Sequence, residues 1–186
     1  KVKTTQARKG VTRRAFNQNE LQQIFGSDYY RDGLYNRSYQ YWIIHLAAFT
    51  GARVNELSQL TTSDVKQDDE GLWYFNITAT EDDGKTVKNE ESRRIIPVHQ
   101  KLIELGFIEY VKVKREEAEK DKSSVNLFDL NKAKADGYGK AASQWFNTKY
   151  LRDYLKVDDK NVVFHSFRHR FISSLAQAIL DASGLS

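Results

Sequence analysis

The spacing of apolar residues predicts a mostly helical chain. Apolar residues at helical spacing begin at Leu21, just after Asn17 and Glu20, a pair typical of a capped helix start. Residues 39–49 are apolar nearly all round, which predicts a buried helix. We interpret His45, which lies within it, as a hydrogen-bonded core residue rather than a catalyst.

Later parts of the chain continue the helical pattern. Residues 141–155 and 166–180 each place aromatic and aliphatic side chains at helical spacing, which predicts two amphipathic core helices. Residues 131–140 are rich in Lys, Gly, Ala and Asp and predict a loop. Residues 109–122 are densely charged but balanced, which predicts a solvated helix. Its expected i,i+4 ion pairs are Lys112–Glu116, Arg115–Glu119 and Glu116–Lys120.

Two stretches between the helices have strand character. Residues 72–78 are rich in aromatic and β-branched side chains, and residues 93–98 form a second apolar run around the single proline, Pro97. Residues 82–84 (DDG) lie between them and are typical of a turn. We therefore predict a mainly α fold with a small antiparallel β-sheet (α+β).

Composition narrows the class of protein. The 186 residues are enough for one domain with a core, and 40% hydrophobic and 29% charged residues are ordinary for a soluble protein. No apolar run approaches the length of a membrane span, so we expect a cytoplasmic protein without membrane partners. With no cysteine and four histidines, we expect neither a disulfide framework nor a metal site.

The positive charge is concentrated at the N-terminus. Six of the 29 basic residues and none of the 25 acidic ones lie in residues 1–14, so the remainder is slightly acidic. We therefore divide the chain into a basic arm, residues 1–15, and a domain, residues 16–186. Such an arm can follow a phosphate backbone, or it can be a solubilising leader or linker. Its candidate DNA-binding residues are Lys1, Lys3, Arg8, Lys9, Arg13 and Arg14.

Residues 50–57 (TGARVNEL) are the first of three stretches suited to binding an oxyanion. Arg53 follows a glycine at the end of the buried helix, and a guanidinium there needs an anion because burying it unpaired is costly. Glu56, three residues on, could orient Arg53. A plain structural Arg–Glu pair would show the same pattern.

The second and third stretches add a lysine and a histidine–arginine pair. Residues 88–97 (KNEESRRIIP) place Lys88 on the hairpin, where it is either a proton donor or simply an exposed lysine. Residues 164–169 (FHSFRH) put His165 and Arg168 on one face of a helix, a pairing that suits phosphate. Cations at a helix N-terminus oppose its dipole, so a bound anion explains them better.

In this order, the three stretches resemble the catalytic domain of tyrosine recombinases, and more closely that of phage and prophage integrases. The resemblance covers nearly the whole chain from about residue 16. It implies that Arg53 and Arg168 grip oxygens of the scissile phosphate, and that His165 positions the phosphate and assists proton transfer. Glu56 would support Arg53. Lys88 would be the general acid to the leaving 5′-oxygen, although Lys85 lies close enough to leave that assignment open.

The resemblance also implies the reaction, which is transesterification at a DNA phosphodiester. In the family a tyrosine attacks and forms a 3′-phosphotyrosyl link, while fixed cations stabilise the transition state without a metal or nucleotide cofactor. The nucleophilic tyrosine is expected downstream of the histidine–arginine motif, but no tyrosine follows Arg168. We therefore expect the domain to lack its nucleophile-bearing segment, and this chain to bind DNA without cleaving it.

Partners follow from the same resemblance. The expected partner is double-stranded DNA at attachment sites, in a bacterial cell carrying a prophage or mobile element. The whole protein would act as a homotetramer on two DNA sites, whereas this chain alone would be monomeric. The basic arm would be the linker that joins the catalytic domain to N-terminal DNA-binding domains.

Three alternatives compete with this interpretation. A type IB topoisomerase shares the chemistry, but residues 92–94 and 165–169 are closer to integrases. A degenerate integrase that binds DNA without cutting would not need the whole set of Arg53, Lys88, His165 and Arg168. A metal-dependent nuclease would use the acidic runs 68–70, 81–83 and 90–91, which bracket predicted turns and are better explained as solvated loops.

Overall fold

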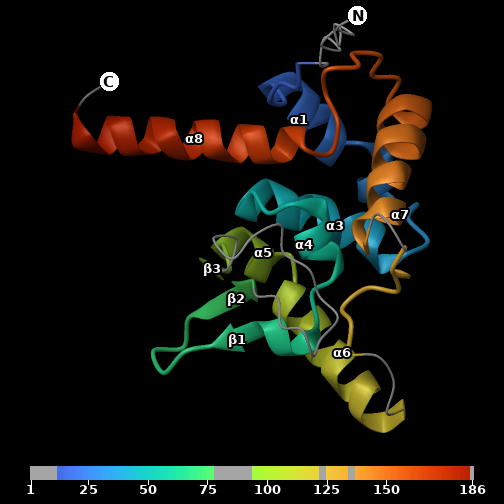
Figure 1. Ribbon diagram of the computed structural model, residues 1–186, viewed down its shortest axis with the longest axis vertical. Helices are drawn as coiled ribbons and strands as arrows, with labels where there is room; N and C mark the ends of the chain where they lie inside the picture. The colour runs from blue at the N-terminus through green and yellow to red at the C-terminus, as the bar shows by residue number, and fades with distance from the viewer. Residues whose placement is uncertain (1–11, 78–93, 122–124, 134–136, 185–186) are drawn as a thin grey trace, which may run out of the picture.

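The computed structural model describes residues 12–77, 94–121, 125–133 and 137–184, and within them it confirms a mainly helical chain with a small antiparallel sheet (Figure 1). The helices are α1 (Gln18–Phe25), α2 (Asp28–Arg31), α3 (Ser38–Thr50), α4 (Val54–Ser58), α5 (Gln100–Glu104), α6 (Phe107–Asp121), α7 (Gly139–Gln144), the π-helix η4 (Trp145–Tyr154) and α8 (Ser166–Ser183). The strands are β1 (Val65–Gln67), β2 (Trp73–Ile77) and β3 (Arg94–Pro97), and a 3₁₀ turn, η1 (Thr62–Asp64), precedes them.

The first helix begins at the predicted residue. The Asn17 side chain accepts a hydrogen bond from the Glu20 amide at 2.8 Å, and the Glu20 carboxylate accepts one from the Asn17 amide at 2.8 Å. Two backbone donors that a helix start leaves without partners are thereby satisfied. The buried Ile24 then anchors α1 in the core.

The predicted buried helix is confirmed as α3, which lies at the centre of the molecule and packs against α4, α5, α7 and α8. Its middle, from Trp42 to Ala47, is buried. His45 is part of this core, as predicted, and its Nδ1 donates to the Tyr41 carbonyl oxygen at 2.7 Å. Burial lowers the pKa of His45, because the charged form would lose hydration.

The sheet has the order β1-β2-β3, with both pairs antiparallel. Phe75 of β2 faces Ile96 of β3 and Val65 of β1, which confirms the predicted pairing of the two longer strands. The predicted turn at residues 82–84 lies outside the described residues. The sequence did not reveal β1, since three residues are too few to show an alternation of apolar and polar positions.

Helix α6 is charged on its surface, as predicted, but with different ion pairs. Lys112 pairs with Glu109 and Lys114 with Glu117, at 3.5 and 2.8 Å. The predicted ion pair between Arg115 and Glu119 is wrong. Its guanidinium points inward instead, donates to the carbonyl oxygen of Thr62 at 2.9 Å and lies over the ring of Trp73.

The helix predicted over residues 141–155 is present as two parts, α7 followed by the wider π-helix η4. The Leu155 amide donates to the carbonyl of Tyr150 at 2.9 Å, five residues back. Phe146, Tyr150 and Leu151 of η4 are buried. The Tyr150 hydroxyl reaches Ser27 at 2.8 Å, so η4 joins the N-terminal helices to the core.

Helix α8 confirms the helix predicted over residues 166–180, but only its beginning is core. Phe167 is buried against Phe16 and Phe146, whereas the apolar side chains further along are exposed. Ile172 and Leu175 are each 50% exposed, and α8 runs out from the body of the molecule (Figure 1). The prediction of a core helix is therefore wrong for this second half. Within the described residues, no helix is both long and apolar enough to cross a membrane.

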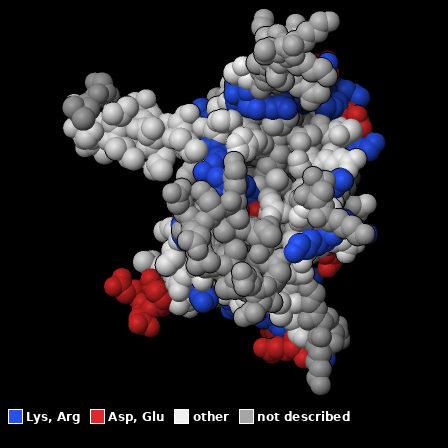
Figure 2. All heavy atoms as spheres, in the orientation of Figure 1, with Lys and Arg blue, Asp and Glu red and all other residues white. Residues whose placement is uncertain are grey.

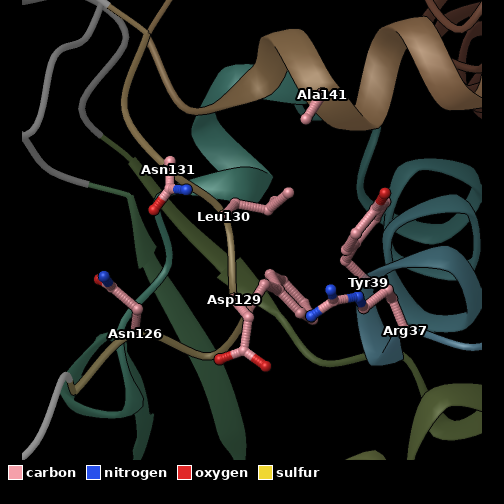
Figure 3. Close-up of a pocket in the computed structure, with 8 residues that line it drawn as sticks. Arg37, Tyr39, Asn126, Asp129, Leu130, Asn131 and Ala141 are labelled. Carbon is pink, nitrogen blue, oxygen red and sulfur yellow. The ribbon is translucent and has the colours of Figure 1, made fainter.

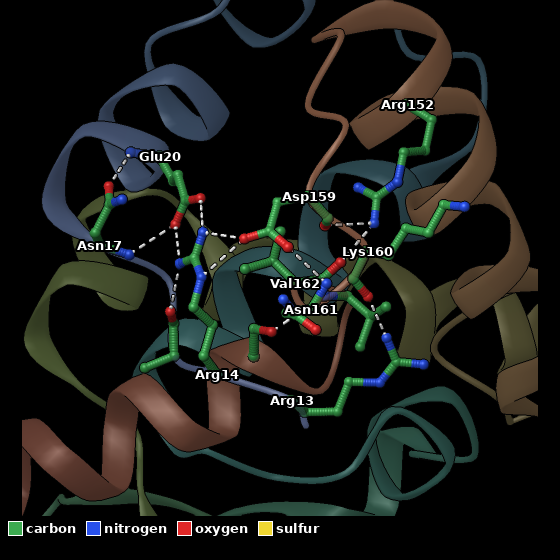
Figure 4. Close-up of polar contacts among 12 residues, drawn as sticks. Arg13, Arg14, Asn17, Glu20, Arg152, Asp159, Lys160, Asn161 and Val162 are labelled. Carbon is green, nitrogen blue, oxygen red and sulfur yellow. Dashed lines mark hydrogen bonds and ion pairs between the residues drawn. The ribbon is translucent and has the colours of Figure 1, made fainter. Parts of the chain in front are cut away.

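The described chain begins in contact with the segment that leads into α8 (Figure 4). The Arg14 guanidinium donates to the carboxylates of Glu20 and Asp159, at 2.6 and 2.7 Å. Its backbone amide donates to the carbonyl of Asn161 at 3.2 Å, and Arg13 donates to the carbonyl of Lys160. These contacts, which we call the Arg14 clasp, fix the N-terminal segment beside the loop before α8.

Candidate active site

The end of helix α3 prepares the site. Gly51 ends the helix in the left-handed conformation, with φ of 60°, and its amide donates to the carbonyl of Ala47. Thr50 folds back onto the turn, since its hydroxyl donates to the carbonyl of Leu46 at 2.6 Å and accepts from the Ala52 amide at 3.1 Å. The chain therefore turns sharply, and Arg53 follows at the start of α4.

The carboxylate of Glu56 lies at the centre of the site. Its side chain is 2% exposed, and it accepts from the Arg53 guanidinium and from the Arg94 guanidinium, each at 2.8 Å. It also accepts from the Arg53 backbone amide at 2.9 Å. Burial acts to raise the pKa of Glu56, but the hydrogen bonds from Arg94 and Arg53 outweigh burial, and the pKa lies below its ordinary value.

The loop that carries His165 is held by η4 and by its own first turn. The Asn147 side chain accepts from the Phe164 amide at 2.7 Å and donates to the Ser143 hydroxyl at 3.1 Å. The Ser166 hydroxyl accepts from the Val163 amide at 3.1 Å, which closes the turn before α8. His165 then takes the N-cap position of α8.

Arg168 lies in the first turn of α8, and its side chain contacts the end of α3. Its guanidinium donates to the carbonyl oxygen of Gly51 at 2.6 Å. Burial lowers the pKa of Arg168, and the neighbouring charges of Arg53 and Arg94 lower it further. Three guanidinium groups are therefore close enough to repel one another around one carboxylate, an arrangement that favours the binding of an anion.

His165 completes the cluster. Its ring packs edge-on against that of His169, with centroids 4.9 Å apart. Burial lowers its pKa below 6.5, as do the charges of His169, Arg168, Arg53 and Arg13. Beside it opens a cavity of about 450 Å³. The lining residues are Arg13, Ala52, Arg53, Val54, Asn55, Ser143, Asn147, Val163, Phe164 and His165.

The structure thus brings together the four predicted site residues that it describes, which are Arg53, Glu56, His165 and Arg168. Arg13 of the predicted DNA-binding arm lines the same cavity, whereas Arg14 is engaged in the clasp. The other predicted residues lie outside the described part of the chain. They are Lys1, Lys3, Arg8 and Lys9 of the arm, and Lys88 with its alternative Lys85.

Sequence analysis missed two residues of the site. Arg94 shares the Glu56 carboxylate with Arg53, and Asn147 holds the backbone before His165. A signal for Arg94 existed, because it occupies the same face of its strand as the half-buried Ile96. A cation on an inward face requires a counter-charge. Asn147 carried no such signal, since it resembles any polar residue on a helix.

A second hollow and an acidic surface lie away from the arginine cluster. A hollow of about 510 Å³ lies between the start of α3 and residues 126–131, and its lining includes Arg37, Tyr39 and Asp129 (Figure 3). Acidic side chains gather at the turn between β1 and β2, whereas basic ones lie beneath and beside α8 (Figure 2). The acidic run 68–70 is exposed at that turn.

Comparison with known protein families identifies the chain. The model of the phage integrase family matches residues 14–186, which is nearly all of it. The chain belongs to the phage integrase family. The match begins at Arg14 and covers every site residue described above, from Arg53 to Arg168, and Lys88 as well. No curated protein matches the chain.

One solved structure supports the fold of this integrase-family chain, and a second match is weaker. It is similar to the crystal structure of XerA recombinase, with a TM-score of 0.50, 20% identity, and coverage of 94% of this chain and 53% of that one. It also matches the Tn1549 transposon integrase in complex with transposon right end DNA, with a TM-score of 0.45, 17% identity, and coverage of 92% and 56%. The chain therefore spans about half the length of these two structures.

The histidine at the site of this integrase-family chain should sense a bound anion. We expect the pKa of His165, which lies below its ordinary value of 6.5 in the free protein, to rise when phosphate is added, because an anion favours the imidazolium form. As pH falls from 6.5 to this lowered pKa, the unfolded chain takes up the proton more readily, so His165 lowers the stability of the fold. NMR titration of the imidazole signals measures both midpoints.

The control for this titration is His45. Burial in the core lowers its pKa as well, but it lies in α3 away from the cavity, so phosphate should leave its midpoint unchanged. An His165 midpoint that phosphate does not move would contradict an anion site at this position.

Proposed function

We propose that this chain is the phosphate-binding catalytic core of a site-specific DNA recombinase. Membership of the phage integrase family supports recombination as the general activity. In this proposal the whole protein breaks and rejoins DNA strands at attachment sites, and this chain supplies the cations that hold the scissile phosphate. Double-stranded DNA is then its partner.

The observation that carries the proposal is the cluster of Arg53, Arg94 and Arg168 around Glu56. Arg53 and Arg94 both donate to the buried carboxylate of Glu56. Burial lowers the pKa of Arg168, which lies close enough for the charges of Arg53 and Arg94 to lower it further. A phosphodiester carries one negative charge, and the transition state of its transesterification carries about one more. In this proposal the fixed guanidinium donors of the cluster stabilise the charge that develops in the transition state.

The other groups divide the proton transfers. The lowered pKa of His165 favours its neutral form, and a neutral imidazole can donate a hydrogen bond to a phosphate oxygen or accept a proton. The first turn of α8 contains no acidic residue, so the helix dipole adds to the attraction for an anion. In this proposal Lys88 protonates the leaving 5′-oxygen.

The chain does not present a nucleophile beside these cations. All ten tyrosines fall within the described residues, and none of them lines the cavity that holds Arg53 and His165. Tyr150 and Tyr154, the two nearest in sequence to the histidine–arginine motif, belong to the aromatic cluster around Tyr29. We propose that this chain binds DNA without forming a phosphotyrosyl bond.

The test is DNA affinity in variants that each remove one guanidinium. We expect Arg53→Ala and Arg168→Ala each to weaken binding to a mixed-sequence 20-base-pair duplex about 10- to 100-fold, since each charge-assisted contact to phosphate contributes about 1.5–3 kcal/mol. Fluorescence anisotropy of a labelled duplex, over a range of salt concentrations, measures the affinity of each variant. Each variant should also reduce the magnitude of the salt slope by about one.

Arg31→Ala is the matched control, because Arg31 is an exposed arginine paired with Asp28 and Asp32 outside the cluster. It should bind as the unaltered chain does. If the two cluster variants bind no more weakly than Arg31→Ala, the proposal is wrong. A protein–DNA adduct that survives denaturation would contradict binding without cleavage.

The assembly of the whole protein is also part of the proposal. We propose that it acts as a homotetramer on two DNA sites, and that this chain alone is a monomer. Analytical ultracentrifugation at micromolar concentration tests the second statement directly, and a dimer in that experiment would contradict it.

A further inference from the structure

Arg94 has no role in the proposal beyond its charge, yet its contacts are specific. It lies at the start of β3, opposite Ile77 in the register of the sheet, and is 38 residues from Glu56 in sequence. Its guanidinium nevertheless reaches the same carboxylate as Arg53. The sheet is therefore tied to helix α4 through one buried acidic side chain.

The two oxygens of that carboxylate are divided between the arginines. Oε1 of Glu56 accepts from the Arg53 guanidinium at 2.8 Å. Oε2 accepts from Arg94 at 2.8 Å and from the Arg53 backbone amide at 2.9 Å. Arg94 thus occupies a position where a second nitrogen of Arg53 would otherwise form a bidentate pair with Glu56.

This division affects where Arg53 points. A bidentate pair would align the Arg53 guanidinium with the carboxylate plane and draw it toward α4. In the structure Arg53 contacts Glu56 through one guanidinium nitrogen, and Arg94 holds the other carboxylate oxygen. The Arg53 guanidinium therefore stays at the cavity that Arg53 lines together with His165. Because the Glu56 side chain is 2% exposed, its oxygens depend on these protein donors for their hydrogen bonds.

We propose that Arg94 is a positioning residue, which acts through Glu56 to hold the Arg53 guanidinium in the orientation that binds phosphate. This inference rests on the proposed function, because it assumes that Arg53 contacts phosphate. A positioning role differs from a purely electrostatic one. If Arg94 only added a positive charge, that charge would attract DNA whether or not Arg53 is present.

A double-mutant cycle on DNA affinity separates these two roles. We expect Arg94→Ala to weaken binding to the 20-base-pair duplex about tenfold in the unaltered chain, and less than twofold in the Arg53→Ala background. In the Arg168→Ala background the tenfold loss should persist, because Arg168 makes its contact with Gly51 rather than with Glu56. Arg94→Lys should recover most of the affinity, since an ammonium can still donate to Oε2.

Each other outcome overturns the inference. An equal loss from Arg94→Ala with and without Arg53 would mean a charge acting alone, and no loss at all would mean a structural contact. If Arg53→Ala itself leaves affinity unchanged, the proposed function fails and the inference fails with it, which is a distinct result. Thermal unfolding in parallel identifies variants that do not fold. Arg94→Met, which keeps the length of the side chain but has no donor, then replaces Arg94→Ala in the same cycle.

Discussion

Gly51→Ala is expected to lower the free energy of unfolding by about 2–5 kcal/mol, as measured by urea denaturation. Two costs combine. The left-handed backbone at Gly51 penalises a residue with a side chain by about 1–2 kcal/mol. A Cβ there would lie 2.5 Å from Cδ1 of Phe171, and relief of such a clash in a packed region costs about 1–3 kcal/mol.

Gly33→Ala is the matched control. Gly33 has nearly the same backbone conformation, with φ of 66°, but a Cβ there meets no atom within 4 Å. Its substitution should therefore show the backbone cost of about 1–2 kcal/mol alone. Equal losses at the two positions would mean that α8 does not pack on Gly51 as the structure shows.

The Gly51→Ala substitution should also weaken DNA binding. Phe171 belongs to α8, and so does Arg168, which donates to the Gly51 carbonyl. A methyl group that displaces Phe171 displaces the start of α8 with it, and the guanidinium moves away from Arg53. We therefore expect folded Gly51→Ala protein to bind the duplex less tightly than Gly33→Ala protein does.

Phe167→Ala is expected to have the largest effect on stability, a loss of about 3–5 kcal/mol. The ring is 1% exposed and packs against the rings of Phe16, Phe146 and Phe164. Its removal leaves a cavity that the surrounding rings, themselves held by other contacts, fill only in part. Urea denaturation of the purified variant measures the loss.

The distal half of the same helix supplies the comparison. Leu175→Ala and Ile179→Ala remove side chains that are 50% and 60% exposed, so each should change the unfolding free energy by less than about 0.5 kcal/mol. The contrast tests whether α8 is anchored at its beginning only. Losses at Leu175 as large as at Phe167 would show that the distal half is packed in solution.

Features that depend on neighbours in sequence were predictable. The capping box at Asn17 involves residues three apart, and the apolar run of α3 requires burial wherever it lies. The strand pair was predictable for the same reason, since its apolar residues and turn signals are consecutive. In each case the local pattern excludes other conformations without reference to the rest of the chain.

Features that depend on distant neighbours were not predictable. Ile172 and Leu175 have the spacing of apolar residues in a core helix. The spacing shows that they share one face of α8, but it does not show whether other residues pack against that face. The π-helix η4 has the side-chain pattern of an α-helix, and its wider turn shows only in the hydrogen bonds. Arg115 was expected to pair with a neighbour on α6, but the carbonyl of Thr62, 53 residues away, takes its hydrogen bond.

The candidate site shows the same division. Arg53, Glu56, His165 and Arg168 were found because each motif keeps its own residues together, and the structure brings the motifs into one cluster. Arg94 was missed because its partner lies 38 residues away, and neither residue alone indicates the other. The spacing of Arg53 and Glu56 suggested a simple pair, whereas the carboxylate is shared by two arginines.

The Arg14 clasp has a consequence for the order in which the chain folds. Its ion pair with Asp159 joins residues 145 apart, so it closes a loop of most of the chain. Loops of that length form late, because the entropy of closure must first be offset by other contacts. The clasp should therefore be absent from the folding transition state. Its loss would speed unfolding and leave the folding rate unchanged, so the two ends of the domain separate first when it opens.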